Sequence, residues 1–383
     1  MRVELRRRRV RFGAGRAGDD ARRCGVLRWL RRYAQSGGGT PMIRLGRCVG
    51  RFAIAACMIA CDAAPAFAGA VVPVSVAGSD IAFNAHTGML YASVPSVAGP
   101  PYGNRVVEIS PVDGSITRSV FVGSEPAAIG SSPDAAVAYV GIEGAASARR
   151  IDLATMTAGA PFGLGRTEEH GPFLYATDIR VMPGSPETIA VALHRIDQIP
   201  WDAGVAVFDA GVARPIVVGT DGATPSSLAF GADAGTLYGA DGSSPPTLAR
   251  LTVAADGVTV AQAHSLSSSN PVRIVFDAGR IYTAQGTVFD QNLAMIGTYA
   301  ASGPVVVDGA SSAVYIVERG RVHVFDRDTF AASYSMPISD VDDPAVVATG
   351  CGAGCMGIVF ESGKVVVVTV DETIFRDGFE SLP

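Results

Sequence analysis

The sequence is poor in charged residues and almost devoid of lysine. Only 17% of its 383 residues are charged and 7% are aromatic, and Lys364 is the single lysine. The chain has no GxSxG, HExxH, P-loop or dinucleotide-binding glycine motif in a fitting context. These absences exclude the reaction classes that depend on those motifs. Any amine chemistry would fall to Lys364, which lies in a strand-like segment.

Helical periodicity is missing as well. No helical pattern of 10–15 residues separates the strand-like segments, which argues against a parallel α/β fold. The chain instead contains 45 Gly, 23 Pro and much Val, Ala and Thr, a composition typical of short strands joined by tight turns. With 48% hydrophobic residues it can fill a large core, and all-β folds of this length often form one domain.

The negative charge is concentrated in one part of the chain. Residues 1–68 hold 15 of the 31 basic and 4 of the 36 acidic residues, so residues 69–383 carry a net charge of −16. A segment this acidic repels phosphate backbones, and we therefore expect no nucleic-acid partner. Cations and polar uncharged ligands are easier to accommodate. We expect a monomer whose partner is a protein, a polymer or a small-molecule ligand.

The amino-terminal region has the pattern of an export signal. Residues 1–41 are rich in arginine and are interpreted as a disordered upstream extension, with a basic nucleic-acid arm as the alternative. Residues 42–68 combine arginines, the short apolar run Phe52–Ala60 and an A-x-A cleavage signal that ends at Ala68. The apolar run is shorter than the roughly 20 residues of a membrane span. We expect cleavage after Ala68 and a periplasmic or extracellular protein.

The positions of the cysteines also bear on whether the protein is exported. The segment that ends at Cys61 resembles a weak lipobox, so a membrane-bound form lipidated at Cys61 is the alternative to a soluble one. Four of the six cysteines precede residue 69, which leaves Cys351 and Cys355 in the loop CGAGC. An isolated pair in an exported segment predicts a disulfide. No further metal ligand is adjacent to this pair, so we predict no metal there.

A repeat of about 33–53 residues runs through residues 69–371. A tyrosine occupies the same place in five strand-like segments, at Tyr91, Tyr139, Tyr238, Tyr282 and Tyr315. A later strand ends in an aspartate whose carboxylate is expected to accept bonds from turn amides, at Asp152, Asp209, Asp290 and Asp326. A proline opens most units, at Pro126, Pro172, Pro225, Pro271, Pro304 and Pro344.

Each unit is predicted to form four antiparallel strands, which is the size of a propeller blade. The count is seven, so we predict an all-β, seven-bladed β-propeller over residues 69–371, followed by a tail of residues 372–383. The last unit has only three evident strands. The strand-like segment Val71–Val76 precedes the first unit and belongs to none of the seven. We therefore predict that Val71–Val76 pairs with Val365–Val370 and closes the ring.

The units also resemble a known family. SSPDAAVAYV with RRIDLATMTAG, and DAGTLYGAD with LARLTVAADG, are similar to repeats of the YVTN-type and lactonase-like bacterial β-propellers over roughly residues 70–370. The resemblance implies the propeller fold. It implies no single activity, because such propellers include ligand binders, surface proteins, lactonases and lyases. The YVTN tetrapeptide itself is absent, and no active-site motif of the family can be carried over.

Candidate ligand-binding residues follow from the repeat. Propeller ligands usually bind around the axis where the inner strands begin, so the residues beside the opening prolines are predicted to converge there. They are Asp80, Glu125, His170, Thr224, Asn270, Ser302 and Asp343. The alternative is that they are polar residues of a water-filled mouth. No catalytic residue is identified.

The leading functional hypothesis is an exported binding or scaffold propeller without catalytic activity and without a cofactor. The alternative is a metal-assisted, lactonase-like hydrolase or lyase, in which Ca²⁺ held by the ring residues would polarise a carbonyl. A divalent ion held by three or more of these residues would favour the enzyme. An axial channel lined by Thr, Ser and apolar side chains would favour binding.

Overall fold

Short strands and tight turns make up the folded part of the chain. The computed structural model describes residues 69–167, 170–196, 199, 201–219, 224–242, 245–266 and 273–370. The predicted upstream extension, signal peptide and carboxy-terminal tail lie outside these residues. The described part contains no α-helix, only the 3₁₀ turns η1 (Ser96–Ala98) and η2 (Glu143–Ala145). It holds no helix long and apolar enough to cross a membrane.

The strands form seven antiparallel sheets, which we number as blades 1 to 7 in chain order. Blade 1 consists of β2 (Asp80–Asn84), β3 (Met89–Val94), β4 (Arg105–Ile109) and β5 (Ile116–Phe121). Blade 2 consists of β6 (Pro126–Ser131), β7 (Val137–Ile142), β8 (Ser147–Asp152), β9 (Thr157–Ala158) and β10 (Phe162–Gly163). Blade 3 consists of β11 (Tyr175–Met182), β12 (Ser185–His194), β13 (Asp202–Asp209) and β14 (Val212–Ala213).

Blades 4 to 7 complete the sheets. Blade 4 consists of β15 (Ser227–Phe230), β16 (Thr236–Ala240), β17 (Thr247–Ala254) and β18 (Gly257–Ser265). Blade 5 consists of β19 (Ile274–Asp277), β20 (Arg280–Thr283), β21 (Thr287–Asp290) and β22 (Met295–Thr298). Blade 6 consists of β23 (Val305–Asp308), β24 (Ala313–Glu318), β25 (Arg321–Asp326) and β26 (Ala332–Pro337). Blade 7 consists of β27 (Ala345–Gly352), β28 (Cys355–Phe360), β29 (Lys364–Val370) and β1 (Gly69–Ala77).

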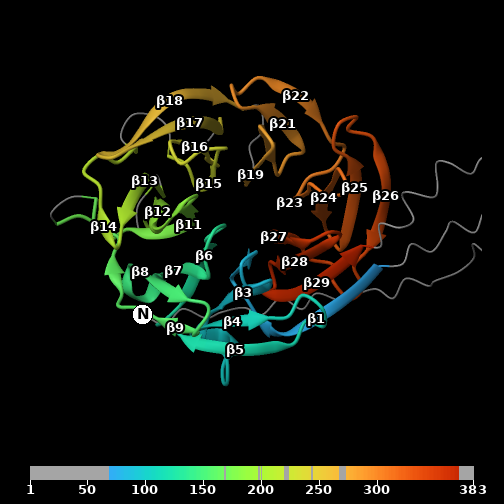
Figure 1. Cartoon of the computed structure of the whole chain (residues 1–383), viewed down its shortest axis with the longest axis horizontal. Helices are drawn as coiled ribbons and strands as arrows, with labels where there is room; N and C mark the ends of the chain where they lie inside the picture. The colour runs from blue at the N-terminus through green and yellow to red at the C-terminus, as the bar shows by residue number, and fades with distance from the viewer. Residues whose placement is uncertain are drawn as a thin grey trace, which may run out of the picture. The chain divides into compact units, whose positions relative to one another are not determined.

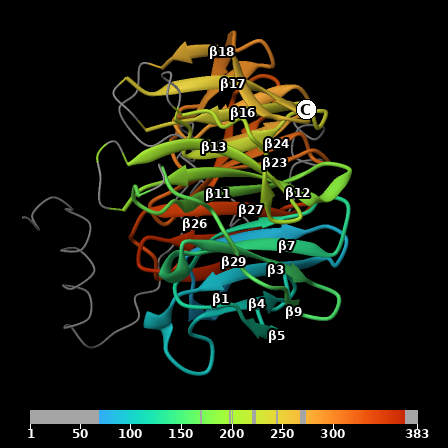
Figure 2. The same ribbon diagram turned by 90° about the vertical axis from the view of Figure 1, so that its left-hand side faces the viewer.

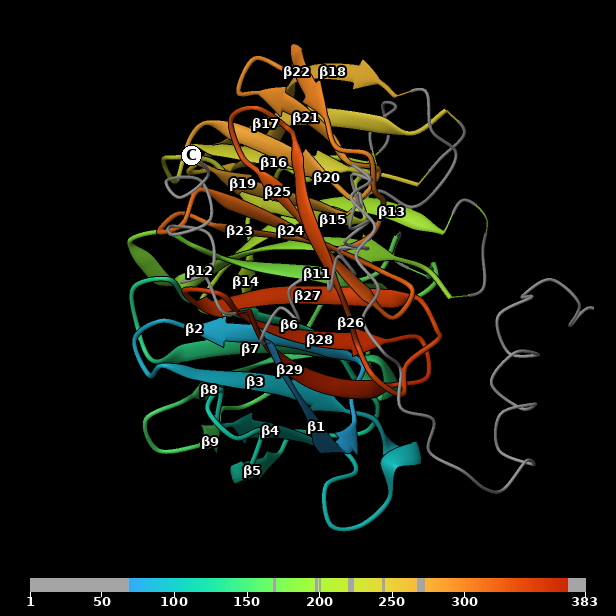
Figure 3. The same ribbon diagram turned by 90° about the vertical axis from the view of Figure 1, so that its right-hand side faces the viewer.

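The seven blades close into a ring, which confirms the predicted β-propeller (Figure 1). The inner strands β2, β6, β11, β15, β19, β23 and β27 contact one another in this order, and β27 contacts β2 again. Blade 2 departs from the four-strand pattern, because its outer position is shared by β9 and β10, which both pair with β8. Side views show the sheets of neighbouring blades in successive layers (Figures 2 and 3).

Blade 7 joins the two ends of the described chain. Its strand order is β1-β29-β28-β27, so the first strand lies on the outside of the last blade. The antiparallel register pairs Val71 with Val368 and Val74 with Val365. The predicted pairing of the amino-terminal strand is therefore confirmed. Closure in this way covers the edge of β29, which would otherwise expose its backbone N–H and C=O groups.

The repeated tyrosines fill the space between blades. Each of the five is at most 2% exposed, and each lies on the second strand of its blade. A buried phenol needs a hydrogen-bond partner. Tyr139 of blade 2 donates to the carbonyl of Pro186 in blade 3 (3.1 Å), and Tyr238 of blade 4 donates to that of Gln291 in blade 5 (3.0 Å). These two tyrosines thus link neighbouring sheets through their hydroxyl groups, whereas the hydroxyl of Tyr91 bonds to Glu108 of its own blade (2.8 Å).

Arginines make a second set of links between blades. Arg118 of blade 1 donates to the carbonyl oxygens of Leu153 (2.9 Å) and Ala154 (2.8 Å) in blade 2. Arg214 of blade 3 reaches the carbonyl of Ala254 in blade 4 (2.6 Å) in the same manner. Each of these guanidinium groups is also paired with a carboxylate of its own blade, Glu108 or Asp209. The carboxylate holds the arginine in the orientation that reaches the next blade.

Candidate functional site

The inner strands bring one residue of each blade to a common level near the axis. This residue directly precedes the first buried aliphatic residue of the strand, such as Ile81, Leu228 or Ile274. The equivalence follows from the pairing with the second strand, because Ala82, Ala229 and Val275 lie opposite the repeated tyrosines. In six of the blades, the residues at this level are Asp80, Ala128, Asp178, Ser227, Arg273 and Pro304.

In three blades, the polar residue at this level accepts a backbone N–H of the next blade. The Oδ2 atom of Asp80 accepts the backbone N–H of Ile129 (3.0 Å), and its Oδ1 accepts that of Ile81 (2.9 Å). Asp178 accepts the N–H of Leu228 (2.7 Å) from the next blade in the same way. Ser227 accepts that of Ile274 (3.2 Å). The axial level therefore has a structural role in addition to any binding role.

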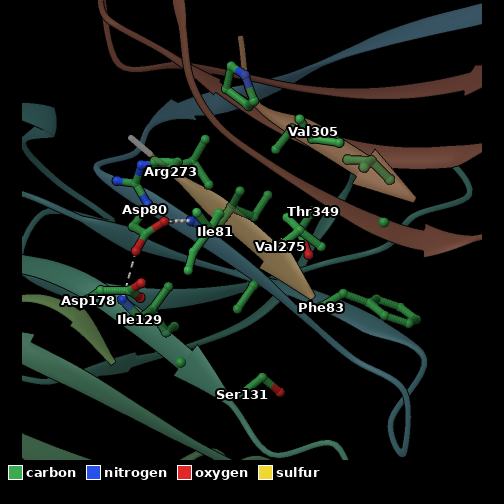
Figure 4. A pocket seen from close by; sticks show the side chains of 18 of the residues that line it. Asp80, Ile81, Phe83, Ile129, Ser131, Asp178, Arg273, Val275, Val305 and Thr349 are labelled. Carbon is green, nitrogen blue, oxygen red and sulfur yellow. Dashed lines mark hydrogen bonds between the residues drawn. The ribbon is translucent and has the colours of Figure 1, made fainter. Parts of the chain in front are cut away.

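A cavity of about 340 Å³ lies among the inner strands (Figure 4). Its charged lining consists of Asp80, Asp178, Arg180 and Arg273. The remaining lining is largely apolar, with Val275, Val305, Val306, Val347 and Phe83 together with the hydroxyl groups of Ser131 and Thr349. The surface that the cavity presents is more polar than apolar, because backbone groups and the four charged side chains contribute to it, and its volume is within the range of small-molecule sites.

The charged side chains of the cavity differ in how many hydrogen-bond and ion-pair partners they have. Asp178, whose side chain is 4% exposed, is paired with Arg180 at 3.2 Å. Asp80 is buried, and burial raises the pKa of its carboxyl against the opposing effect of Arg273, beside which it lies. The guanidinium of Arg273 donates no hydrogen bond to any residue that the structure describes. Arg273 is therefore the guanidinium of this cavity that no described carboxylate or carbonyl engages by a hydrogen bond, whereas Arg180 pairs with Asp178.

The cavity does not match the predicted ring. Of the predicted residues only Asp80 lines it, and Asn270 lies outside the described residues. Glu125 accepts from the backbone N–H of Ser96 (3.3 Å), and Asp343 accepts from that of Ser362 (2.7 Å). His170 is exposed. The other two members of the ring, Thr224 and Ser302, are likewise absent from the lining.

The difference has a physical cause. Pro126, Pro172 and Pro225, which helped to set the predicted register, lie two or more residues before the level at which the inner strands converge, whereas Pro304 lies on that level. A better signal was present in the sequence. The polar residue that directly precedes the first aliphatic residue of the inner strand marks the level, as in S-D-I-A-F, T-D-I-R-V and V-R-I-V-F. This signal would have found Asp178 and Arg273, which were missed.

The predicted disulfide between Cys351 and Cys355 is confirmed. It bridges the hairpin between β27 and β28, with the two Cα atoms 5.0 Å apart. The backbone N–H of Gly354 in the same turn donates to Oδ2 of Asp308 in blade 6 (2.9 Å). Gly350, just before the bridge, lines the axial cavity. The bridge therefore holds a turn that adjoins the candidate site.

The described residues of the cavity do not suit Ca²⁺. This ion takes roughly six to eight oxygen ligands. The only carboxylates of the lining are Asp80 and Asp178, and both already accept backbone amide bonds while two guanidinium groups lie close by. Within the described ranges no group of three or more His, Cys, Asp or Glu side chains is arranged to hold a metal ion.

Comparison with known proteins supports the fold. No protein-family model matches the chain, and no curated protein matches it. Hydrazine synthase of Kuenenia stuttgartiensis is similar over 77% of this chain and 96% of its own, with a TM-score of 0.60 and 17% identity. The β-propeller domain of Myceliophteria thermophila Cps50 (Swd1) is similar over 77% of this chain and 97% of its own, with a TM-score of 0.56 and 10% identity. At these identities the likeness shows the propeller fold alone.

Proposed function

We propose that the protein is an exported β-propeller that binds a small organic carboxylate in its axial cavity. The observation that carries this proposal is the Arg273 guanidinium, which lies in the cavity without an acceptor among the described residues. A planar guanidinium with five donors matches a carboxylate in two parallel hydrogen bonds. Binding of this kind needs no catalytic group.

Hydrogen-bond accounting favours an anion over a cation. Both oxygens of Asp80 accept backbone N–H groups. Asp178 accepts the backbone N–H of Leu228 and forms an ion pair with Arg180. Each carboxylate of the cavity thus already has hydrogen-bond donors, whereas the guanidinium of Arg273 has no acceptor among the described residues. Arg273 is half-buried, so water competes less for its donors than it would at a fully exposed arginine.

The net negative charge of the propeller does not oppose this proposal. Charges separated by more than about 8–10 Å are largely screened at physiological ionic strength. The charged groups that line the cavity therefore decide which sign of ligand charge it accepts. In this lining two guanidinium groups offset the two carboxylates. The apolar walls at Val275, Val305 and Val347 suit the hydrocarbon part of the same ligand.

Export and family remain part of the proposal. The arginine-containing, short apolar and A-x-A pattern before Gly69 supports export, and the Cys351–Cys355 bridge agrees with an oxidising compartment. The repeat sequences support kinship with the YVTN-type and lactonase-like propellers. A lipidated form at Cys61 is the alternative to a soluble one.

Calorimetry with benzoate and succinate, and with benzamide as an uncharged counterpart, tests the binding proposal. We expect at least one carboxylate to bind the full chain and the Arg273→Gln variant to bind it at least tenfold more weakly, because each charge-assisted pair of bonds contributes about 1.5–3 kcal/mol. The matched Arg149→Gln variant, changed outside the cavity, should bind as the unaltered protein does. Equal affinity of Arg273→Gln, or no binding of either carboxylate, would refute the proposal.

A further inference from the structure

A second cavity, of about 410 Å³, lies at the junction of blades 2 and 3. Its walls are apolar and come from segments far apart in the chain. Leu164 follows β10, Leu174 precedes β11, Leu193 belongs to β12, Phe208 to β13 and Val218 follows β14. Its size is within the usual range of ligand pockets, and it shares no residue with the axial cavity.

The polar side chains of this second cavity are mainly cationic. Arg166 and Arg195 line it, and no carboxylate occurs among its described lining residues. Arg166 is engaged, because its guanidinium carbon lies 3.5 Å from the centre of the Phe173 ring and its Nη1 donates to the carbonyl of Gly171 (2.9 Å). Arg195 also interacts electrostatically with the carboxyl group of Asp202, which lies outside the lining. The two guanidinium groups of the lining itself point to a ligand of the opposite sign.

Arg195 has an unused donor at this cavity. Its Nη2 donates to the backbone carbonyl of Asp202 (3.0 Å), whereas its Nε is buried and has no hydrogen-bond partner among the described residues. A buried N–H without an acceptor costs about 1–3 kcal/mol in a native structure. A carboxylate in the cavity would pair with Nη1 of the same guanidinium, which donates to no described residue, while an attached hydrocarbon chain would cover the leucine and phenylalanine walls.

We propose that this cavity is a second binding site, for a monocarboxylate with an unbranched apolar chain, of the kind found in medium-chain fatty acids. The apolar walls exclude a strongly polar ligand, because burying its polar groups without partners would be costly. The guanidinium favours the carboxylate over an alcohol of equal length. The site is independent of the axial cavity, so either proposal can fail without the other.

The intrinsic fluorescence of Trp201 provides the measurement. The chain has two tryptophans, Trp29 and Trp201, so Trp29→Phe leaves one reporter. The backbone carbonyl of Trp201 accepts the N–H of Arg195 (2.7 Å), and the indole is 63% exposed. Octanoate added to the Trp29→Phe chain should change this fluorescence saturably. We expect Arg195→Gln, introduced into this chain, to raise the dissociation constant for octanoate at least tenfold. The Trp29→Phe chain with Arg195 intact should bind octan-1-ol at least tenfold more weakly than octanoate.

Two further variants make the test decisive. Ala213→Leu adds volume at the exposed edge of the cavity, where a larger side chain can be tolerated without refolding, and should weaken octanoate binding even if Arg195→Gln folds poorly. Arg273→Gln should leave octanoate binding unchanged, which separates this site from the axial one. An unsaturable response, or equal octanoate affinity in the Trp29→Phe chain with and without Ala213→Leu, would overturn the proposal.

Discussion

Asp80 and Asp178 occupy equivalent places in blades 1 and 3, yet they differ in their arginine partners. Both carboxylates accept an amide from the next blade, and this bond explains why an acid is retained at a buried position. Asp178 has a guanidinium partner two residues further along its own strand, in Arg180. Asp80 has none on its strand and depends on Arg273 from blade 5, so burial raises the pKa of its carboxyl.

Asp202 allows a prediction at the scale of a residue. Burial, together with the nearby charge of Asp241, raises the pKa of its carboxyl from 3.8 to about 6. The raised value means that ionisation costs the folded state free energy, and this cost is complete above pH 6 and absent below about pH 4. Asp202→Asn should therefore increase the free energy of unfolding by about 1–2 kcal/mol at pH 7.5, a range reduced for the partial exposure of the group.

Urea unfolding at pH 7.5 and at pH 4 measures this effect. The gain from Asp202→Asn should disappear at the lower pH, because both proteins then carry a neutral side chain at this position. The exposed Asp342→Asn serves as the matched control and should change stability little at either pH. The same gain for Asp202→Asn at both pH values would contradict the assigned pKa.

At the scale of an element, the repeated features of the sequence predict strands and turns well. Three of the four hairpin aspartates act as expected: Asp152, Asp290 and Asp326 accept backbone amides of their own turns. Asp209 differs, because it pairs with Arg214 (2.8 Å) and Thr188 (2.8 Å) instead. A turn motif needs only neighbours in the chain, whereas the Asp209 pair depends on the adjacent strand β12 and on the arginine after β14.

The hairpin between β27 and β28 gives a prediction at this scale. Replacing both cysteines, Cys351→Ala and Cys355→Ala, should lower the free energy of unfolding by about 2 kcal/mol, as loop-closure entropy predicts for so short a loop. Guanidinium unfolding of the exported protein, with and without a reductant, measures the loss. The reductant should destabilise the unaltered protein by a similar amount and leave the double variant unchanged.

Intact mass serves as the control for that experiment. The exported protein should begin at Gly69 and weigh two hydrogens less than the reduced chain. A protein that begins at Met1 with two free thiols at these positions would contradict both the export proposal and the disulfide.

At the scale of the whole propeller, completion of the last blade depends on one strand pair, that of β1 with β29. β1 is the only strand of blade 7 that comes from the amino-terminal end, and its Val74 is buried at 5% exposure opposite Val365. Without it, β29 would present an apolar edge whose central residues are four consecutive valines, a template for aggregation. The pairing of β1 with β29 therefore covers an edge that would otherwise favour aggregation.

Two neighbouring residues of β1 test this view. Val74→Asp should destabilise the propeller by about 3 kcal/mol or more and promote aggregation, because it places an unpaired charge in the core of the closing blade. Ser75→Asp, one residue further along and facing solvent, should change stability by less than about 0.5 kcal/mol. Thermal unfolding followed by light scattering compares them, and equal behaviour of the two variants would argue against closure through β1.

The amino-acid sequence by itself determined the fold class, the number of blades, the closing strand and the disulfide. Each of these rests on local patterns, namely alternation of apolar residues, turn residues at fixed offsets and two cysteines four residues apart. The axial level was decided only by the tertiary structure, because it depends on which residues lie opposite each other on paired strands. Arg273, 193 positions after Asp80, lies beside that residue because four blades of chain curve between them. The cavities likewise form where segments distant in sequence pack together, and no local sequence pattern predicts such contacts.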